Sequence, residues 1–230
     1  MRPHFRREAL VDVGGWDPHN VTEDADLGVR LQRFGYRTAT ISLPTLEDAP
    51  EEIMVWLRQR TRWYKGWMQT WLVHMRQPVR LYRDLGAGSF LIFQILFGGL
   101  IASALLHPLL WGTTLLLCGK SALWGVLVPN ERWLLGLSGM NIAAGYGSFL
   151  LLGWRCLPPR DRAGYWKTAL STVPYWLLMS VAAYRAIGQL VWRPHYWEKT
   201  PHRRFRRSRG LRKAAGEKTA AGRAAPAGAV

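Results

Sequence analysis

Residues 90–118 read FLIFQILFGGLIASALLHPLLWGTTLLLC, and this apolar stretch decides the fold of the chain. It contains no Asp, Glu, Lys or Arg. A helix that spans a bilayer needs about 20 predominantly apolar residues, so the stretch is long enough to cross a membrane. His107-Pro108 lies inside it and can kink the helix or divide it into two. The sequence therefore predicts a helical membrane region that begins near Phe90.

Further apolar segments follow this stretch. Trp133–Trp154 is a second candidate span, and Ala169–Tyr184, which can extend to Trp192, is a third. Leu109–Val128 is a marginal fourth because it contains Lys120. Tryptophans near the edges of these segments favour the bilayer interface. The patterns allow two to four crossings and leave the number open.

The charge lies on both sides of the apolar region. The chain has 31 Lys and Arg against 15 Asp and Glu, a net charge of +16, which suggests an anionic membrane face, an anionic substrate or a polyanion as partner. Because basic flanks stay on the cytoplasmic side, residues 1–83 and the tail are expected to share that side.

The tail, residues 193–230, is expected to be basic and largely disordered, because Ala, Gly and Pro dominate its end. Its densest cluster, Arg203–Lys213, is expected to meet the headgroups of anionic membrane lipids. No nucleic-acid partner is expected, since a single aromatic residue, Phe205, lies among the arginines. The two cysteines, Cys118 and Cys156, have no metal-ligand spacing and are expected to be unpaired.

Residues 1–46 alternate between helix and strand signals. A short helix is expected over Arg6–Val13, closed by Gly14-Gly15. Asn20 or Thr22 can cap a second helix that ends near Phe34, with Glu23 completing a capping-box pattern. A strand rich in Thr and Ile is expected over residues 36–43.

A long amphipathic helix is expected from Pro50-Glu51-Glu52 to Met75, because Pro and acidic residues favour a helix start. Its apolar residues recur at steps of three and four. Such a helix can lie flat at a membrane surface or pack on a protein core, and the apolar stretch that follows it favours the membrane.

Two short motifs carry candidate chemistry. The first is Thr22-Glu23-Asp24 at a helix start, where a rigid carboxylate is well placed to take a proton from an attacking hydroxyl. The second is Gln59-Arg60-Thr61-Arg62-Trp63, in which Gln59, Arg62 and Trp63 share one helix face. Arg62 can fork onto phosphate oxygens, and Trp63 offers a flat apolar face to a sugar ring. Each motif taken alone also suits an ordinary helix start or amphipathic helix.

Both motifs, in this order and followed by apolar spans, resemble the acceptor end of membrane-embedded family 2 glycosyltransferases, the group that includes cellulose, chitin and hyaluronan synthases. Gly14-Gly15-Trp16-Asp17 strengthens the resemblance, which covers about residues 1–200. It implies that Asp24 is the catalytic base, with Thr22 and Glu23 shaping its surroundings. It also implies that Gln59 and Arg62 lie near the diphosphate of the nucleotide and that Trp63 lies beneath the acceptor sugar.

The resemblance further implies a fold and a location. The expected fold class is α/β: residues 1–83 would be the C-terminal part of a GT-A catalytic domain with an amphipathic interface helix, followed by a helical transmembrane region over residues 84–192. The expected location is the bacterial inner membrane, in a multi-pass arrangement. In the family the nucleotide-sugar half precedes the Thr-Glu-Asp motif, and only 21 residues precede it here, so the chain is expected to be inactive by itself.

The expected partners are a nucleotide-sugar and a glycan acceptor in the complete enzyme, together with membrane lipids. No cofactor or metal is expected in this chain, whereas a divalent cation, Mg²⁺ or Mn²⁺, is expected in the complete enzyme. Asp24-Ala25-Asp26 is not expected to bind it, because residues i and i+2 of a helix point in opposite directions. Asp26 is instead expected to pair with Arg30. The alternative function is a non-catalytic membrane protein with a lipid-binding tail.

Overall fold

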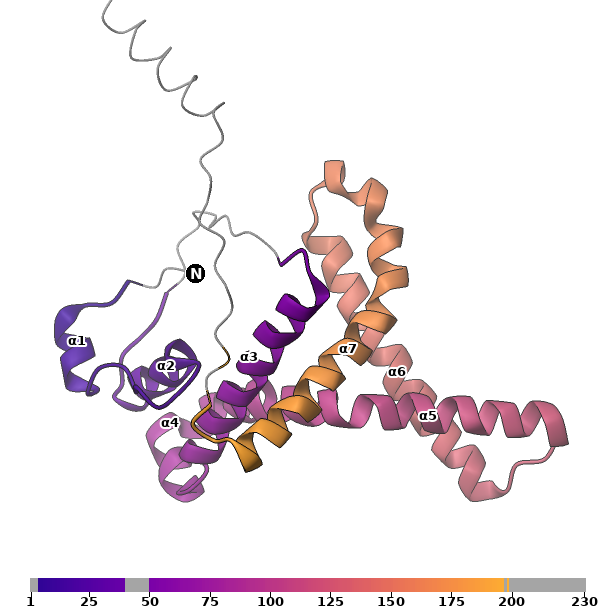
Figure 1. The fold of residues 1–230 in the computed structure, drawn as a ribbon, viewed down its shortest axis with the longest axis horizontal. Helices are drawn as coiled ribbons and strands as arrows, with labels where there is room; N and C mark the ends of the chain where they lie inside the picture. The colour runs from indigo at the N-terminus through magenta and orange to yellow at the C-terminus, as the bar shows by residue number, and fades with distance from the viewer. Residues whose placement is uncertain (1–3, 40–49, 197, 199–230) are drawn as a thin grey trace, which may run out of the picture. The chain divides into compact units, whose positions relative to one another are not determined.

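The computed structural model describes residues 4–39, 50–196 and 198, and these residues fold as helices joined by loops (Figure 1). The helices are α1 (Arg7–Asp12), α2 (Glu23–Arg33), α3 (Ile53–His74), α4 (Pro78–Phe93), the π-helix η1 (Gln94–Gly99), α5 (Leu100–Trp124), α6 (Pro129–Cys156), the 3₁₀ helix η2 (Pro159–Gly164) and α7 (Tyr165–Trp192). The helices predicted near residues 6–13, 22–34 and 50–75 are confirmed within a few residues at their ends. The predicted apolar helix over residues 90–118 lies in a longer run that begins at Pro78, and residues 109–128 do not form a separate helix. Most of the predicted tail lies outside the described residues.

The predicted α/β fold class is wrong for the part of the chain that the structure describes, which contains no strand. Residues 36–39 of the predicted strand are irregular, and residues 40–43 lie outside the described ranges. The physical reason is that Thr and Ile favour a strand only where a neighbouring strand supplies the backbone partners. The described residues offer no such neighbour, so the expected piece of a GT-A sheet is not seen.

A small apolar cluster joins α1 to α2. It consists of Ala9, Val13, Leu27 and Leu31, all buried. The chain reverses between these helices through Gly14-Gly15, whose φ angles of 81° and 71° are readily adopted only by glycine. The glycine turn thus carries the chain from α1 toward the start of α2.

The main apolar cluster lies between α3 and α7, which run side by side (Figure 1). Tyr64 and Met68 of α3 pack on Ala182, Ala183 and Ala186 of α7. The three alanines are fully buried, and their small side chains let the two helices approach closely. The apolar face of the predicted amphipathic helix is therefore covered by protein along this part of its length.

The long apolar stretch forms one continuous run of α4, η1 and α5. The run has a non-helical residue, Gly86, at φ 73° and ψ 165°. Pro108 lies inside α5 and does not divide it. Proline removes one helical hydrogen bond at this point. The hydroxyl of Tyr184 in α7 donates to the nearby carbonyl of Leu105 at 2.5 Å, which ties the altered turn to α7.

Within the described residues, two helical segments are long and apolar enough to cross a membrane, Pro78–Trp124 and Pro129–Cys156. Few residues in either segment are buried by the rest of the chain. They are therefore unlike the core helices of a soluble protein, which bury their apolar residues. The third predicted span corresponds to α7, which does not pass the same test and lies against α3 and α5.

Candidate functional site

The start of α2 rests directly on α3. Thr22, the residue before α2, is buried, and its side chain fills the space beside Gly66. A Cβ at residue 66 would lie 2.3 Å from Thr22 Oγ1, so only glycine allows this approach. Because Trp63 and Gly66 stand one helical turn apart, the contact brings the Thr22-Glu23-Asp24 segment to the helix face that carries the second motif.

Hydrogen bonds extend this contact along α3. Asn20 Nδ2 donates to Thr70 Oγ1 at 2.8 Å, and both side chains are buried. Asn20 Oδ1 accepts from the backbone amide of Thr22 at 3.0 Å and from its hydroxyl at 3.3 Å. Thr22 therefore precedes the helix as predicted, but its side chain makes no capping bond, and the predicted capping box is absent.

Asp26 lies at the centre of a buried polar network. Arg30 Nε donates to Asp26 Oδ2 at 2.8 Å, which confirms the predicted pair. His74 Nε2 of α3 lies 3.1 Å from Asp26 Oδ1. Burial raises the pKa of Asp26, but the hydrogen bond from His74 and the charge of Arg30 outweigh it and hold that pKa below its ordinary value.

The network continues through His74 to α4. Arg33 Nη1 lies 3.1 Å from His74 Nδ1, and because a guanidinium can only donate, Nδ1 is the acceptor. His74 is then neutral and donates from Nε2 to Asp26. The same Arg33 donates to Asp84 Oδ2 of α4 at 2.6 Å and 2.9 Å. One chain of contacts therefore locks α2, α3 and α4 together.

The predicted base, Asp24, remains accessible. Its side chain is exposed, and Oδ1 accepts from the amide of Ala25 at 2.9 Å. Glu23 is half-buried. The residues of the first motif therefore differ in exposure: Thr22 is buried in the contact with α3, and Asp24 presents its carboxylate to the surroundings of the chain.

The second motif lies on α3, with Gln59, Arg62 and Trp63 all half-buried. The guanidinium of Arg60 stacks over the Trp63 ring at 4.2 Å, which orients the indole. Arg62 Nε is buried without a hydrogen-bond partner among the described residues. A buried guanidinium N–H without a partner is unfavourable, so it favours the arrival of an anionic ligand.

The segment after α7 returns to α3. Lys65 is buried, and its Nζ donates to the carbonyls of Arg193 at 2.9 Å and Tyr196 at 2.7 Å. Burial lowers the pKa of Lys65. Glu198, also buried, accepts from Arg185 at 2.6 Å and from Gln189 at 3.1 Å. These contacts fasten residues 193–196 and Glu198 to α3 and α7, one turn from Arg62.

The described residues do not fit a divalent cation. No group of three or more His, Cys, Asp or Glu side chains is gathered among them. Asp26, the other acidic residue of the Asp24-Ala25-Asp26 segment, is occupied by Arg30 and His74.

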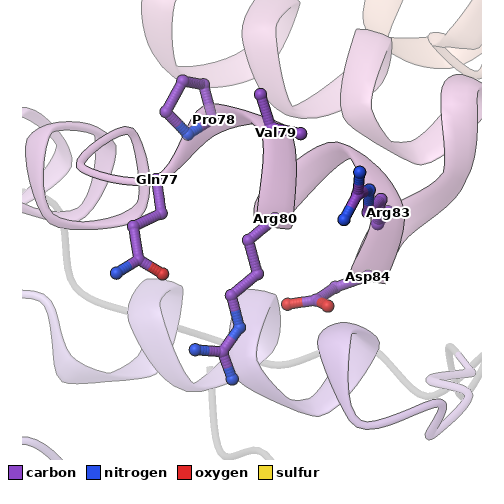
Figure 2. Close-up of a pocket in the computed structure, with 6 residues that line it drawn as sticks. All are labelled: Gln77, Pro78, Val79, Arg80, Arg83 and Asp84. Carbon is purple, nitrogen blue, oxygen red and sulfur yellow. The ribbon is translucent and has the colours of Figure 1, made fainter.

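A cavity of about 460 Å³ lies at the start of α4 and is separate from both motifs (Figure 2). Figure 2 shows Gln77 and Arg80 pointing to the same side of the helix. Asp84, which also lines the cavity, is held by Arg33. None of the predicted site residues lines this cavity, so it is not the candidate site.

Sequence reasoning missed the buried polar residues that hold the motifs in place. Gly66, Thr70 and His74 recur every four residues on one face of α3, and this period was the available signal. Lys65 and Glu198 had no comparable signal, because their contacts join residues far apart in the chain. Both cysteines are free thiols, as predicted.

Comparison with known proteins identifies relatives. A family model described as glycosyl transferase family group 2 matches residues 4–192. A probable glycosyltransferase of Bacillus subtilis, YdaM, is 34% identical over 107 residues, which are 44% of this chain and 26% of that protein. A beta-monoglucosyldiacylglycerol synthase of Synechocystis is 32% identical over 139 residues, 55% of this chain and 29% of that protein.

A cellulose synthase 1 catalytic subunit (UDP-forming) of Komagataeibacter xylinus is 38% identical over 70 residues, 30% of this chain and 9% of that protein. The chain thus spans less than a third of the length of each of these three relatives. No solved structure matches the chain.

Proposed function

The chain belongs to glycosyl transferase family group 2, and from this premise we propose that it carries the acceptor side and the membrane part of an inverting glycosyltransferase. The reaction moves a sugar from a nucleotide-sugar to a hydroxyl group at the cytoplasmic face of the bacterial inner membrane. The printed names of the relatives point to a glucosylated lipid or to a polysaccharide as product. The acceptor is therefore a hydroxyl of a glycan or of a lipid.

The observation that carries this proposal is the contact of Thr22 with Gly66. It supports a single site to which α2 contributes an exposed carboxylate and α3 contributes Gln59, Arg62 and Trp63. Such a site needs both parts, because an alcohol is a poor nucleophile at neutral pH and a diphosphate leaves with negative charge.

In the proposed reaction, Asp24 accepts the proton of the acceptor hydroxyl as its oxygen attacks the anomeric carbon. The new carbon–oxygen bond forms while the bond to the diphosphate breaks, and a single displacement inverts the anomeric centre. Arg62, with its buried Nε, and Gln59 bind the departing nucleotide diphosphate. Trp63, held by Arg60, supports the acceptor sugar.

The membrane part of the proposal rests on α5 and α6. Large apolar side chains are exposed along both helices, for example Leu116 at 68% and Met140 at 65%. Contact of this surface with hydrocarbon carries no desolvation cost, whereas its contact with water is unfavourable. We place both helices in the bilayer as crossing segments, which leaves α3 and the motifs on the side of the basic flank.

The test is a graft of the 230 residues onto the nucleotide-binding half of a related synthase, assayed for donor turnover in membranes. Asp24→Asn should lower turnover by about 100-fold or more, as expected for the loss of a general base. Gln32→Ala, at an exposed residue of the same helix, is the matched control and should leave turnover unchanged. Equal turnover in the Asp24→Asn graft and the unmutated graft would show that Asp24 is not the base.

A further inference from the structure

A second cavity lies where α5, α6 and α7 meet. It measures about 190 Å³, and polar side chains line it from two apolar helices: Ser103 and His107 of α5, and Asn141 and Tyr146 of α6. Trp176 of α7 also lines it. The cavity therefore gathers hydrogen-bonding groups in the part of the chain with the fewest charges.

These polar residues lie near the middle of their helices. His107 falls inside the uncharged stretch 90–118, and Asn141 and Tyr146 fall near the centre of Pro129–Cys156. In hydrocarbon each unpaired polar group is unfavourable by several kcal/mol, so such groups are rare there and mark functional positions. If these side chains had a purely structural role, all of their hydrogen-bonding groups would be paired with one another.

Their mutual contacts satisfy only some of them. Tyr146 Oη lies 2.9 Å from His107 Nε2, and Trp111 Nε1 donates to the same hydroxyl at 3.4 Å. Since the indole can only donate, the tyrosine proton is free to point at His107 Nε2, and His107 then keeps its own proton on Nδ1. Ser103 and Asn141 are exposed at the rim and add a hydroxyl and an amide.

We propose that this cavity binds the uncharged hydroxyl-bearing headgroup of a membrane lipid, such as a diacylglycerol. No Lys, Arg, Asp or Glu lines the cavity, so nothing there would neutralise a charged headgroup. A hydroxyl both donates and accepts hydrogen bonds, which matches the Ser, Asn, His and Tyr groups present.

The size and position of the cavity favour a lipid over a sugar chain. Its volume is below the roughly 300–1,000 Å³ of common ligand sites, which suits a headgroup of few atoms. Leu106 and Met140, the chain neighbours of the lining residues His107 and Asn141, are 53% and 65% exposed to the surroundings of the helices. A lipid can therefore insert its headgroup while its acyl chains stay along this apolar surface. The proposal rests on the membrane placement proposed above, but not on sugar transfer.

The experiment uses the whole chain in phosphatidylcholine nanodiscs with a dioleoylglycerol probe that carries a photoreactive acyl chain. Unlabelled dioleoylglycerol should displace the probe, and trioleoylglycerol, which lacks the hydroxyl, should not. His107→Phe and Tyr146→Phe should each lower specific capture by up to about tenfold, the value of one lost hydrogen bond. Tyr82→Phe, which removes an exposed tyrosine hydroxyl of α4 outside the cavity, is the matched control and should keep capture unchanged.

Four results would overturn the proposal. Equal displacement by both unlabelled lipids, or unchanged capture in Tyr146→Phe, shows that the cavity does not recognise a hydroxyl. Displacement by cellotetraose assigns the cavity to a glycan instead. Release of the chain from membranes by carbonate would contradict the proposed position of α5 and α6 in the bilayer, and with it this lipid site. Normal capture alongside full turnover in the Asp24→Asn graft would leave this site standing while the assigned base fails.

Discussion

Helices α3 and α6 are both long, yet one face of the first is buried by protein and the second is almost bare. In α3, Thr61, Lys65, Thr70 and His74 are buried together with the apolar residues. In α6, Ser138 is the buried residue, and large apolar side chains such as Met140 are exposed. A buried polar group needs a protein partner, and a bare apolar surface needs a nonpolar solvent. The difference indicates that α3 is built for contact with other helices, and it supports the proposed placement of α6 in lipid.

The largest effect is expected from a substitution that removes the centre of the polar network between α2 and α3. Asp26→Ala leaves Arg30 without its carboxylate and His74 without its acceptor, which should lower the stability of the α2–α3 contact by about 3–5 kcal/mol. Hydrogen exchange of the α2 amides in detergent measures this change. Asp84→Ala removes a carboxylate that is 28% exposed, against 5% for Asp26, and should lower stability by about 1 kcal/mol or less. Equal effects of the two substitutions would contradict a network centred on Asp26.

The next effect tests the lipid side of the comparison. Met140→Arg places a charge near the middle of α6, and in a bilayer it should disfavour insertion by about 2.5–3.5 kcal/mol. In water the same change at an exposed residue would alter stability by about 0.5 kcal/mol or less. The measurement is the membrane-inserted fraction after carbonate extraction. Val11→Arg, at an exposed residue of α1, is the control, and an equal inserted fraction in both variants would argue against α6 in lipid.

A smaller effect comes from the close approach of the two motif segments. Gly66→Ala inserts a methyl group where Thr22 already stands, which should lower stability by about 1–3 kcal/mol and reduce turnover of the grafted synthase. Gly28→Ala in α2 meets nothing within 4 Å and should instead stabilise its helix by up to about 1 kcal/mol. Hydrogen exchange measures the stability of both variants, and donor turnover measures the activity of the grafted synthase. Unchanged turnover in Gly66→Ala would show that the activity does not depend on the contact between Thr22 and Gly66.

The smallest effect is the acid dependence of the same network. The pKa of Asp26 is lowered in the folded chain, so its contribution to stability is present above its ordinary value of 3.8 and is lost as the pH falls through the lower folded value. Protection of the α2 amides should therefore fall at acidic pH below about 4. Asp26→Asn cannot titrate and should lack this component. If protection of the α2 amides depends on pH in the same way in the unmutated chain and in Asp26→Asn, the group that titrates is not Asp26.

The helices could be predicted from the sequence because their signals are local. Proline and acidic residues mark the start of α3, glycines mark the end of α1, and the uncharged length of residues 90–118 marks a helix long enough to span. The strand over residues 36–43 was predicted with the same kind of signal, but a strand depends on a partner that propensity does not supply. Local reasoning failed where the element needs a neighbour.

The candidate site likewise contains residues that could be predicted from local patterns and residues that could not. Asp24, Gln59, Arg62 and Trp63 were predicted as site residues because their types and spacing suit sugar transfer, and their roles stay predictions. His74 was missed although it follows Gly66 and Thr70 at steps of four, because that spacing does not show which residues the helix face contacts. Its significance comes from contacts with Asp26 and Arg33 across two helices.

Residues close together in the chain were enough to identify the two motifs, the basic flanks and the presence of long apolar helices. Only the tertiary structure decided that Thr22 fills the space at Gly66, that Lys65 holds the segment after α7, and that His107 meets Tyr146. These contacts join residues far apart in sequence, and which distant side chains meet is set by the packing of whole helices. Packing of this kind depends on all the contacting faces at once, so no local pattern encodes it.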